Sequence, residues 1–353
     1  MKTRGSNRNS VIFFVLVFAA LIVFFQYKHS FNAGSLSGAE NKKQEEKKDI
    51  SPLNGLSCDN YNRRPIAVML ANDEVARPLS GLSEADMVFE MQVVEDSITR
   101  LMAVFVCNSP EDLGSIRSAR HNFIPLAMGL DAIYAHWGGS HFALEKLNKG
   151  IMDNIDAMRN PYEAFFRKLG ISAPHNGFST IEKLIASAGK LKYRLENNFE
   201  GYKHQAQNSK LFNYNVITKS EATGLKIQNP NKKIEINYAY PWNVEWRYDE
   251  SKNSYLRFRK GEIEIDKNNN QQIEAENIVV MFAKSRPLEG QYNDVDVEGE
   301  GGIALYQNGE EIKGKWKKDR NNPKSKLYFL EESGQEVKFV PGQIWVEIIE
   351  PGK

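Results

Sequence analysis

Residues 131–148 read DAIYAHWGGSHFALEKLN, and this stretch decides how the N-terminal part of the chain should fold. A short apolar run at residues 132–135 is broken by Gly138 and Gly139, and a helical pattern begins at Ser140. The stretch therefore predicts a strand, a tight glycine turn and a helix N-terminus. Free backbone N–H groups at such a turn attract anions. The alternative is a simple turn in which Ser140 caps the helix.

Strands and helices alternate on both sides of this stretch. Two of the predicted strands follow each other closely enough to form a hairpin. The mixture of element types predicts an α/β, mixed-sheet domain at residues 52–210. The predicted elements are strands at residues 66–71, 87–94 and 98–106 and helices at residues 123–130, 161–169 and 179–191.

From residue 211 onward the sequence changes character. Segments such as KIEINYAY, VEWRYDE, SYLRFRKG and ENIVVMFA alternate polar and apolar residues, and Asn- and Gly-rich turns separate them. This pattern predicts a run of hairpins. Residues 211–353 are therefore expected to form an antiparallel β-rich C-terminal domain, a barrel or a sandwich of about eight strands.

The N-terminus indicates the compartment. Positively charged residues precede an unbroken apolar run at residues 11–25, which predicts a membrane-targeting segment with the rest of the chain outside the cytoplasm. Residues 1–30 are either an uncleaved single-pass anchor or a signal peptide, and the bulky aromatic content of the run favours the anchor. Residues 31–51 are polar and lack periodicity, so we expect a flexible tether there.

Charge and cysteine content exclude several functions. With 46 Lys and Arg against 45 Asp and Glu, the net charge is +1, which disfavours nucleic acid as a partner. Cys58 and Cys107 are the two cysteines, and in an oxidising compartment they either form a disulfide or remain separate buried thiols. Neither lies in a Cys-x-x-Cys motif, and no dinucleotide or Walker motif occurs, so we expect no metal or cofactor.

Two arginines precede the central stretch. Arg117 and Arg120 are predicted at a helix start, where basic residues oppose the helix dipole. Because guanidinium groups bind phosphate and carboxylate bidentately, the pair suits an anionic ligand. The alternative is that both arginines form ion pairs with acidic residues of the neighbouring hairpin.

Histidines and a serine complete the candidate site. His136 ends the predicted strand and His175 lies in the loop APHNG, and each is an acid/base group, an anion donor or a packing residue. Ser140 lacks the Gly-x-Ser-x-Gly context of a serine nucleophile. The predicted ligand-binding residues are Arg117, Ser118, Arg120, His136, Gly138, Gly139 and Ser140, with Arg100 and His175 as second contributors.

Several short strings together resemble the YerB-like family of bacterial cell-envelope proteins, whose members are usually lipoproteins. The resemblance implies an envelope location and an N-terminal domain followed by a β-rich one, and it implies no reaction. A lipobox cysteine is absent here, which supports the anchor over lipidation. The strings are RRPIAVMLAND, ARPLSGLSEADMVFE, ITRLMAVF, GSIRSAR, DAIYAHWGGS, APHNG, SYLRFRKG, IALYQNGEEIKGKWKK and VPGQIWVEII.

Three functions are consistent with these observations. The first is a membrane-tethered protein that binds an anionic envelope ligand, namely a peptidoglycan precursor, a teichoic-type polymer or a phosphate group. The second is a hydrolase or transferase acting on cell-wall glycan or phosphodiester, with His136 or His175 as acid/base and a carboxylate such as Glu90 as its partner. The third is a non-catalytic partner of wall-synthesis proteins that uses the β-rich domain as its contact surface.

Overall fold

The computed structural model describes residues 49–206 and 233–352 of the chain. The predicted anchor at residues 1–30, most of the tether at residues 31–51 and the predicted domain boundary at residues 210 and 211 lie outside these ranges. Among the described residues, no helix is both long enough and apolar enough to cross a membrane.

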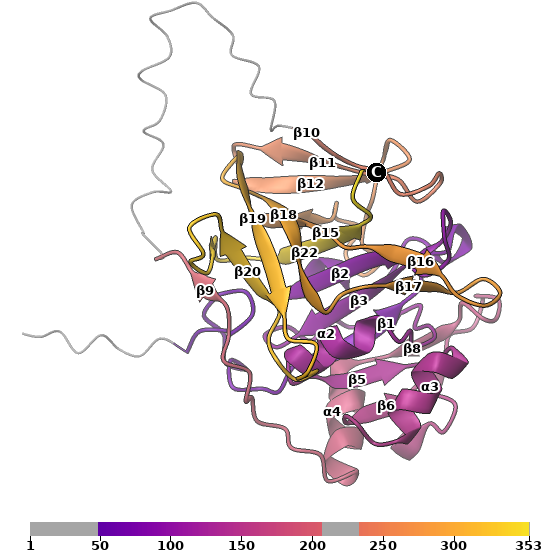
Figure 1. Cartoon of the computed structure of the whole chain (residues 1–353). Helices are drawn as coiled ribbons and strands as arrows, with labels where there is room; N and C mark the ends of the chain where they lie inside the picture. Colours follow the sequence, from indigo (N-terminus) through magenta and orange to yellow (C-terminus); the bar gives the residue numbers. More distant parts are fainter. Residues whose placement is uncertain (1–48, 207–232, 353) are drawn as a thin grey trace, which may run out of the picture. The chain divides into compact units, whose positions relative to one another are not determined.

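A ten-stranded sheet organises the described residues (Figure 1). Its N-terminal part is mixed, because β1 runs antiparallel to β3 and parallel to β5, and β5 is parallel to β6. The predicted hairpin is confirmed as β2 and β3. These strands are β1 (Ile66–Leu70), β2 (Met87–Gln92), β3 (Thr99–Phe105), β5 (Ile133–His136) and β6 (Asn154–Asp156).

The C-terminal half of the chain supplies the remaining strands of the same sheet. Most of them pair antiparallel, as predicted, but β22, which ends the chain's secondary structure, lies between β15 and β2 and runs parallel to both. The two halves are therefore joined by main-chain hydrogen bonds as well as by sequence. These strands are β15 (Asn277–Phe282), β18 (Gly299–Gln307), β19 (Glu310–Lys318), β20 (Tyr328–Glu331) and β22 (Ile344–Ile349).

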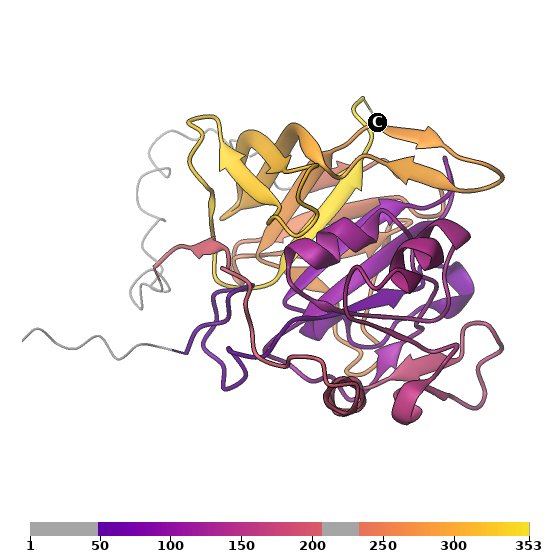
Figure 2. The ribbon, with the colours of Figure 1, turned by 60° about the horizontal axis from the view of Figure 1, so that its bottom comes forward.

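Each face of the large sheet has its own apolar core. Alternate residues of a strand point to opposite faces, so Phe89 and Val346 belong to one core and Val88 and Trp345 to the other. Two helices contribute to the first core, and a third helix packs into the second (Figure 2). In order, these helices are α2 (Phe123–Gly129), α3 (His141–Asn148) and α4 (Ile181–Lys190).

A second, five-stranded antiparallel sheet covers the C-terminal part of that second face. The alternation of its strands buries Trp246, whose ring lies 5.1 Å from that of Trp345 on the large sheet. The C-terminal half is therefore sandwich-like here. Its strands are β10 (Lys233–Ile236), β11 (Val244–Asp249), β12 (Ser254–Arg259), β13 (Glu262–Ile263) and β14 (Glu274–Ala275).

The segment 115–120 was expected at the start of a helix, and that prediction is wrong. Ile116 forms a β-bridge with Leu70, and Ala119 forms one with Gly139. These backbone hydrogen bonds hold the segment extended between its neighbours, so helix α2 starts only after it.

The short helix predicted at residues 161–169 is also largely absent. Only a single 3-10 turn forms, and the chain then pairs as a strand with the residues after the APHNG loop. The predicted helix α4 is confirmed, with Thr180 as its N-cap. The remaining short elements are η1 (Glu74–Ala76), η2 (Leu82–Glu84), η3 (Pro161–Glu163), β4 (Leu113–Gly114), β7 (Phe166–Arg167), β8 (Gly177–Ser179), β9 (Lys203–His204), β16 (Ser285–Pro287), β17 (Asn293–Val295) and β21 (Lys338–Phe339).

The two cysteines form a disulfide. The Cα atoms of Cys58 and Cys107 are 5.6 Å apart, within the range that a disulfide requires. The predicted bridge is confirmed, and the alternative of two separate thiols is excluded. The bond attaches the segment that precedes β1 to the end of β3.

Candidate functional site

The candidate site lies at one edge of the large sheet, where the parallel strands β1 and β5 end. Asp73 follows β1, and Trp137 follows β5. Arg100 comes from the start of β3, which runs antiparallel to β1 and therefore begins at the same edge. In open sheets with parallel strands, ligands bind in the crevice outside the carboxyl ends of those strands.

Basic side chains gather around Asp73 at this edge. Arg100 Nη1 lies 3.1 Å from Asp73 Oδ2, and Arg117 Nε lies 3.9 Å from the same oxygen. Burial lowers the pKa of Arg100 to about 10; Asp73 opposes this effect, and the guanidiniums of Arg117 and Arg120 add to it. We call these three arginines, with Asp73 and His175, the arginine cluster.

The arginine cluster has more positive charge than its own carboxylate balances. With His175 neutral, three guanidiniums face one carboxylate, a formal balance of +2. Within the described ranges, the buried Nε atoms of all three arginines, and Asp73 Oδ2 as well, lack a hydrogen-bond partner. Partial burial lowers the pKa of His175, and Arg117 and Arg100 lower it further against the opposing Asp73. An anion bound beside the guanidiniums would offset the excess positive charge.

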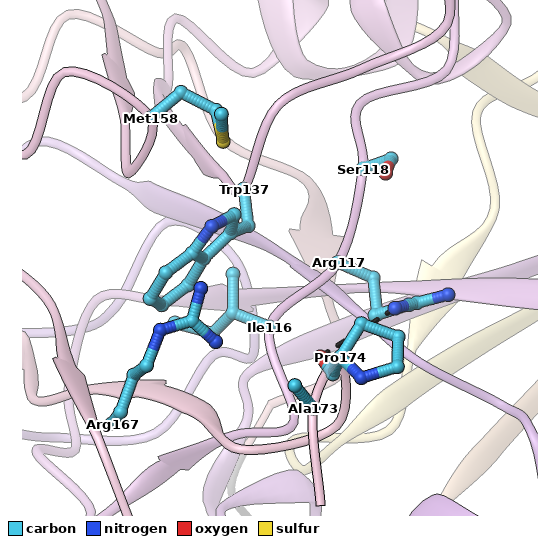
Figure 3. A pocket seen from close by; sticks show the side chains of 8 residues that line it. All are labelled: Ile116, Arg117, Ser118, Trp137, Met158, Arg167, Ala173 and Pro174. Carbon is cyan, nitrogen blue, oxygen red and sulfur yellow. Dashed lines mark hydrogen bonds between the residues drawn. The ribbon is translucent and has the colours of Figure 1, made fainter.

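A pocket of about 280 Å³ adjoins the arginine cluster and shares Arg117 with it (Figure 3). On one side, the guanidinium of Arg167 lies over the ring of Trp137, 4.5 Å from the ring centroid. On the other side Arg117 Nη1 donates to the Pro174 carbonyl at 3.5 Å, so the predicted APHNG loop forms part of the wall. The lining residues are Ile116, Arg117, Ser118, Trp137, Met158, Arg167, Ala173 and Pro174.

His136 is a buried packing residue in this structure. Its Nδ1 lies 2.8 Å from the Gly138 carbonyl oxygen, and its Nε2 lies 3.3 Å from Asn154 Oδ1. Burial lowers its pKa, against the opposing charge of Asp156. Both ring nitrogens thus have partners inside the protein, and the side chain is 0% exposed.

The glycine turn also uses its polar groups internally. The Gly138 N–H donates to Asp156 Oδ1 at 2.8 Å, and the Ser140 N–H donates to the Ala119 carbonyl at 3.0 Å. Ser140 Oγ accepts from the Ala143 N–H, so the N-cap alternative is confirmed. The turn supports the segment that carries the arginines. The Gly138 N–H, the Ser140 N–H and Ser140 Oγ are already used in these hydrogen bonds and are not available to an anion.

Of the predicted site residues, the structure brings together Arg100, Arg117, Arg120 and His175, with Ser118 in the adjoining pocket. Trp137 and Arg167 also line the pocket and were not among the predicted site residues. Trp137 could have been predicted, because it directly follows a predicted strand and precedes the glycine turn. Arg167 had no such signal, because the pairing of β7 with β8 is what turns it toward the pocket.

The C-terminal half also reaches the arginine cluster. Tyr292 lies in the turn between β16 and β17, and the guanidinium of Arg120 lies over its ring, 5.2 Å from the ring centroid. That hairpin is attached to the N-terminal half by the His121–Asp294 contact of 3.2 Å and by the His141–Glu289 contact of 2.7 Å. The site is therefore built by both halves of the chain.

A second charged cluster lies between the two sheets. Arg257 donates from Nη1 to Glu347 at 2.6 Å, from Nε to Glu264 at 2.8 Å and from Nη2 to Glu90. Arg259 donates to Glu90 at 3.0 Å and to Glu264 at 3.1 Å. The Arg257 guanidinium also lies 4.7 Å and 4.0 Å from the ring centroids of two tryptophans. We call these five residues the buried charge network.

Glu90 is therefore unavailable to the histidines proposed for an enzyme. It is 0% exposed and bound by two arginines, and its oxygen also accepts from Thr99 at 2.7 Å. Two strands, β3 and β1, lie between β2 and β5, so Glu90 and His136 are separated by roughly 14 Å at the usual strand spacing. The geometry does not bring this acid/base pair together.

The fold and this site can be compared with known proteins. Residues 53–194 match the N-terminal domain, and residues 234–346 the C-terminal domain, of a protein family of unknown function, DUF3048. The chain belongs to this family.

Among individual relatives, "Putative lipoprotein YerB" of Bacillus subtilis (strain 168) is 30% identical over 309 residues, which cover 86% of this chain and 87% of the relative. The crystal structure of the YerB protein from Bacillus subtilis matches with a TM-score of 0.71 and 27% sequence identity, over 85% of this chain and 96% of that chain. The predicted resemblance to the YerB-like family is confirmed.

Proposed function

We propose that this protein binds an anionic ligand through the arginine cluster. The observation that carries the proposal is the excess of three guanidiniums over one carboxylate. A structural ion-pair cluster would contain at least one carboxylate for each guanidinium, as the buried charge network does. Hydrogen bonds between guanidinium and phosphate or carboxylate are among the strongest available to proteins.

We further propose that the protein is tethered to the membrane and acts in the cell envelope. The apolar run at residues 11–25, preceded by positive charges, supports an anchor with the body outside the cytoplasm. The Bacillus subtilis relative is named "Putative lipoprotein YerB", which supports a membrane-attached location. Suitable envelope ligands are a peptidoglycan precursor, a teichoic-type polymer or a simpler phosphate group.

Calorimetric titration of the full chain in an uncharged detergent tests the anion site, with inorganic phosphate and pyrophosphate as probes. We expect saturable binding that the double substitution Arg117→Gln/Arg120→Gln weakens by at least about tenfold, since charge-assisted hydrogen bonds are lost. The matched control is Arg247→Gln, an exposed arginine of β11 that contacts Glu245 and Phe258 instead. Absence of binding, or equal affinity in the double variant, contradicts the proposal.

A further inference from the structure

The pocket beside the arginine cluster differs from the cluster in its chemistry. A small anion is recognised by donors and charge, and an apolar wall adds nothing to its binding. More than half of the pocket lining is nonetheless apolar, and one of these residues, Met158, is 71% exposed. The apolar lining residues are Ile116, Trp137, Met158, Ala173 and Pro174.

We propose that the ligand is a phosphate monoester on a single ring of monosaccharide size, with the ring in the pocket and the phosphate on the arginine cluster. This inference rests on the proposed anion-binding function. Arg117 belongs to both regions, so one ligand can reach both. Figure 3 shows Trp137 and Met158 on one side of the pocket and Ser118 and Arg117 on the other.

The size of the pocket limits the ring. Its volume of about 280 Å³ is just below the usual range for drug-sized ligands, about 300–1,000 Å³. One sugar ring fits this space, whereas a purine nucleoside, with two fused rings and a ribose, would fill most of it. The formal balance of +2 on the arginine cluster matches the double negative charge of a phosphate monoester near neutral pH.

The polar groups of the pocket favour a ring with hydroxyl groups. Arg167 is fixed over the indole of Trp137 by its 2.6 Å hydrogen bond to Asn176, so its remaining donors point at the pocket from the indole side. The Ser118 hydroxyl and the Pro174 carbonyl lie opposite. Donors and acceptors around an apolar wall suit a sugar ring, which has an apolar face and a polar edge.

Titration of the full chain in uncharged detergent with glucose 1-phosphate, inorganic phosphate, glucose and adenosine 5′-monophosphate tests the proposal. We expect glucose 1-phosphate to bind about tenfold more tightly than phosphate, from the burial of one ring face. In the variants Trp137→Leu and Met158→Ala this advantage should shrink while phosphate affinity stays the same. Met158 is largely exposed, so its truncation should leave the fold intact.

The outcomes separate this proposal from the function on which it rests. Equal affinities for glucose 1-phosphate and phosphate, or an advantage that survives both variants, overturn the ring-phosphate ligand while the anion site stands. Tighter binding of adenosine 5′-monophosphate than of glucose 1-phosphate overturns the sugar-sized ring. If neither phosphate nor any phosphate ester binds, the anion site itself is refuted.

Discussion

The two arginine-containing clusters of this protein differ in how their charge is balanced. In the buried charge network, every nitrogen of the Arg257 and Arg259 guanidiniums donates a hydrogen bond, and the two side chains are 0% and 2% exposed. In the arginine cluster, three guanidiniums share one carboxylate, and the Arg117 side chain is 19% exposed beside a pocket. Every guanidinium nitrogen of the first cluster thus has an acceptor, whereas the Nε atoms of the second lack a hydrogen-bond partner among the described residues.

The two clusters also differ in the sign of the charge that is in excess. The buried charge network contains three carboxylates against two guanidiniums, and Glu347 Oε2 has no hydrogen-bond partner within the described ranges. Burial raises the pKa of Glu347; Arg257 opposes this effect and Glu90 adds to it. Arg77 also interacts with Glu264 and Glu90 and adds a third positive charge beside the network. The arginine cluster has excess positive charge on groups that do not release protons near neutral pH, which supports the proposed anion site.

The largest expected effect comes from breaking the buried charge network. Replacing Arg257 with Met leaves Glu264 and Glu347 buried with fewer partners, so the free energy of unfolding should fall by about 3–5 kcal/mol. Urea unfolding followed by tryptophan fluorescence measures this loss. Arg247→Met on the exposed surface of β11 is the control and should change stability by less than about 0.5 kcal/mol. A loss below about 1 kcal/mol for Arg257→Met would contradict the assigned structural role.

Acid should weaken the same network. Burial alone would raise the pKa of Glu264, but Arg259 and Arg257 lower it from 4.5 to about 2. A carboxyl group with a lowered pKa in the folded state stabilises the protein above its unfolded pKa, and this contribution, about 3 kcal/mol, is lost as the pH falls from about 4.5 to 2. The free energy of unfolding, measured as a function of pH, should therefore fall more steeply in this window for the wild type than for Glu264→Gln. Equal slopes would refute the prediction.

A smaller effect is expected from removing the single carboxylate of the arginine cluster. Asp73→Asn raises the formal balance by one positive charge, so phosphate affinity should increase by about tenfold. Stability should change little, because Asp73 is only partly buried and exposed ion pairs contribute modestly. Calorimetric titration of both proteins measures the change. Weaker phosphate binding in Asp73→Asn would mean that Asp73 orients the arginines rather than competing with the anion.

The smallest expected effect concerns His175. Its pKa lies below the usual value, so the ring is neutral at pH 7 and gains a positive charge as the pH falls. Sulfate keeps its double charge over this range, and its affinity should rise by about threefold between pH 7 and pH 5 because the charge added is largely solvent-exposed. His175→Gln should abolish the increase. A rise that persists in this variant would point to another titrating group.

Much of the N-terminal half was predictable because its signals are local. The hairpin at residues 87–106, the glycine turn and the Thr180 cap each depend on neighbours in sequence, and each appears in the structure. The arginine pair was also predictable as a candidate, since two guanidinium groups close in sequence suit an anionic ligand. Its predicted helical setting was wrong, because the bridges to Leu70 and Gly139 are long-range.

The rest of the fold and of the candidate site depends on contacts between distant parts of the chain. Glu90 looked like a hairpin carboxylate, but its partner Arg257 lies 167 residues further on and buries it. The position of β22 between β2 and β15 likewise follows from strand pairing that no local pattern encodes. Trp137 and Arg167 meet for the same reason, through the pairing of β7 with β8.

The position of β22 has a consequence for folding. Residues Ile344–Ile349 belong to the C-terminal half, yet they pair on both sides inside the large sheet. Without β22, β2 and β15 each keep an unpaired edge, and the large sheet cannot close. The large sheet is therefore not complete in the N-terminal half alone, and the two halves must fold together to form it.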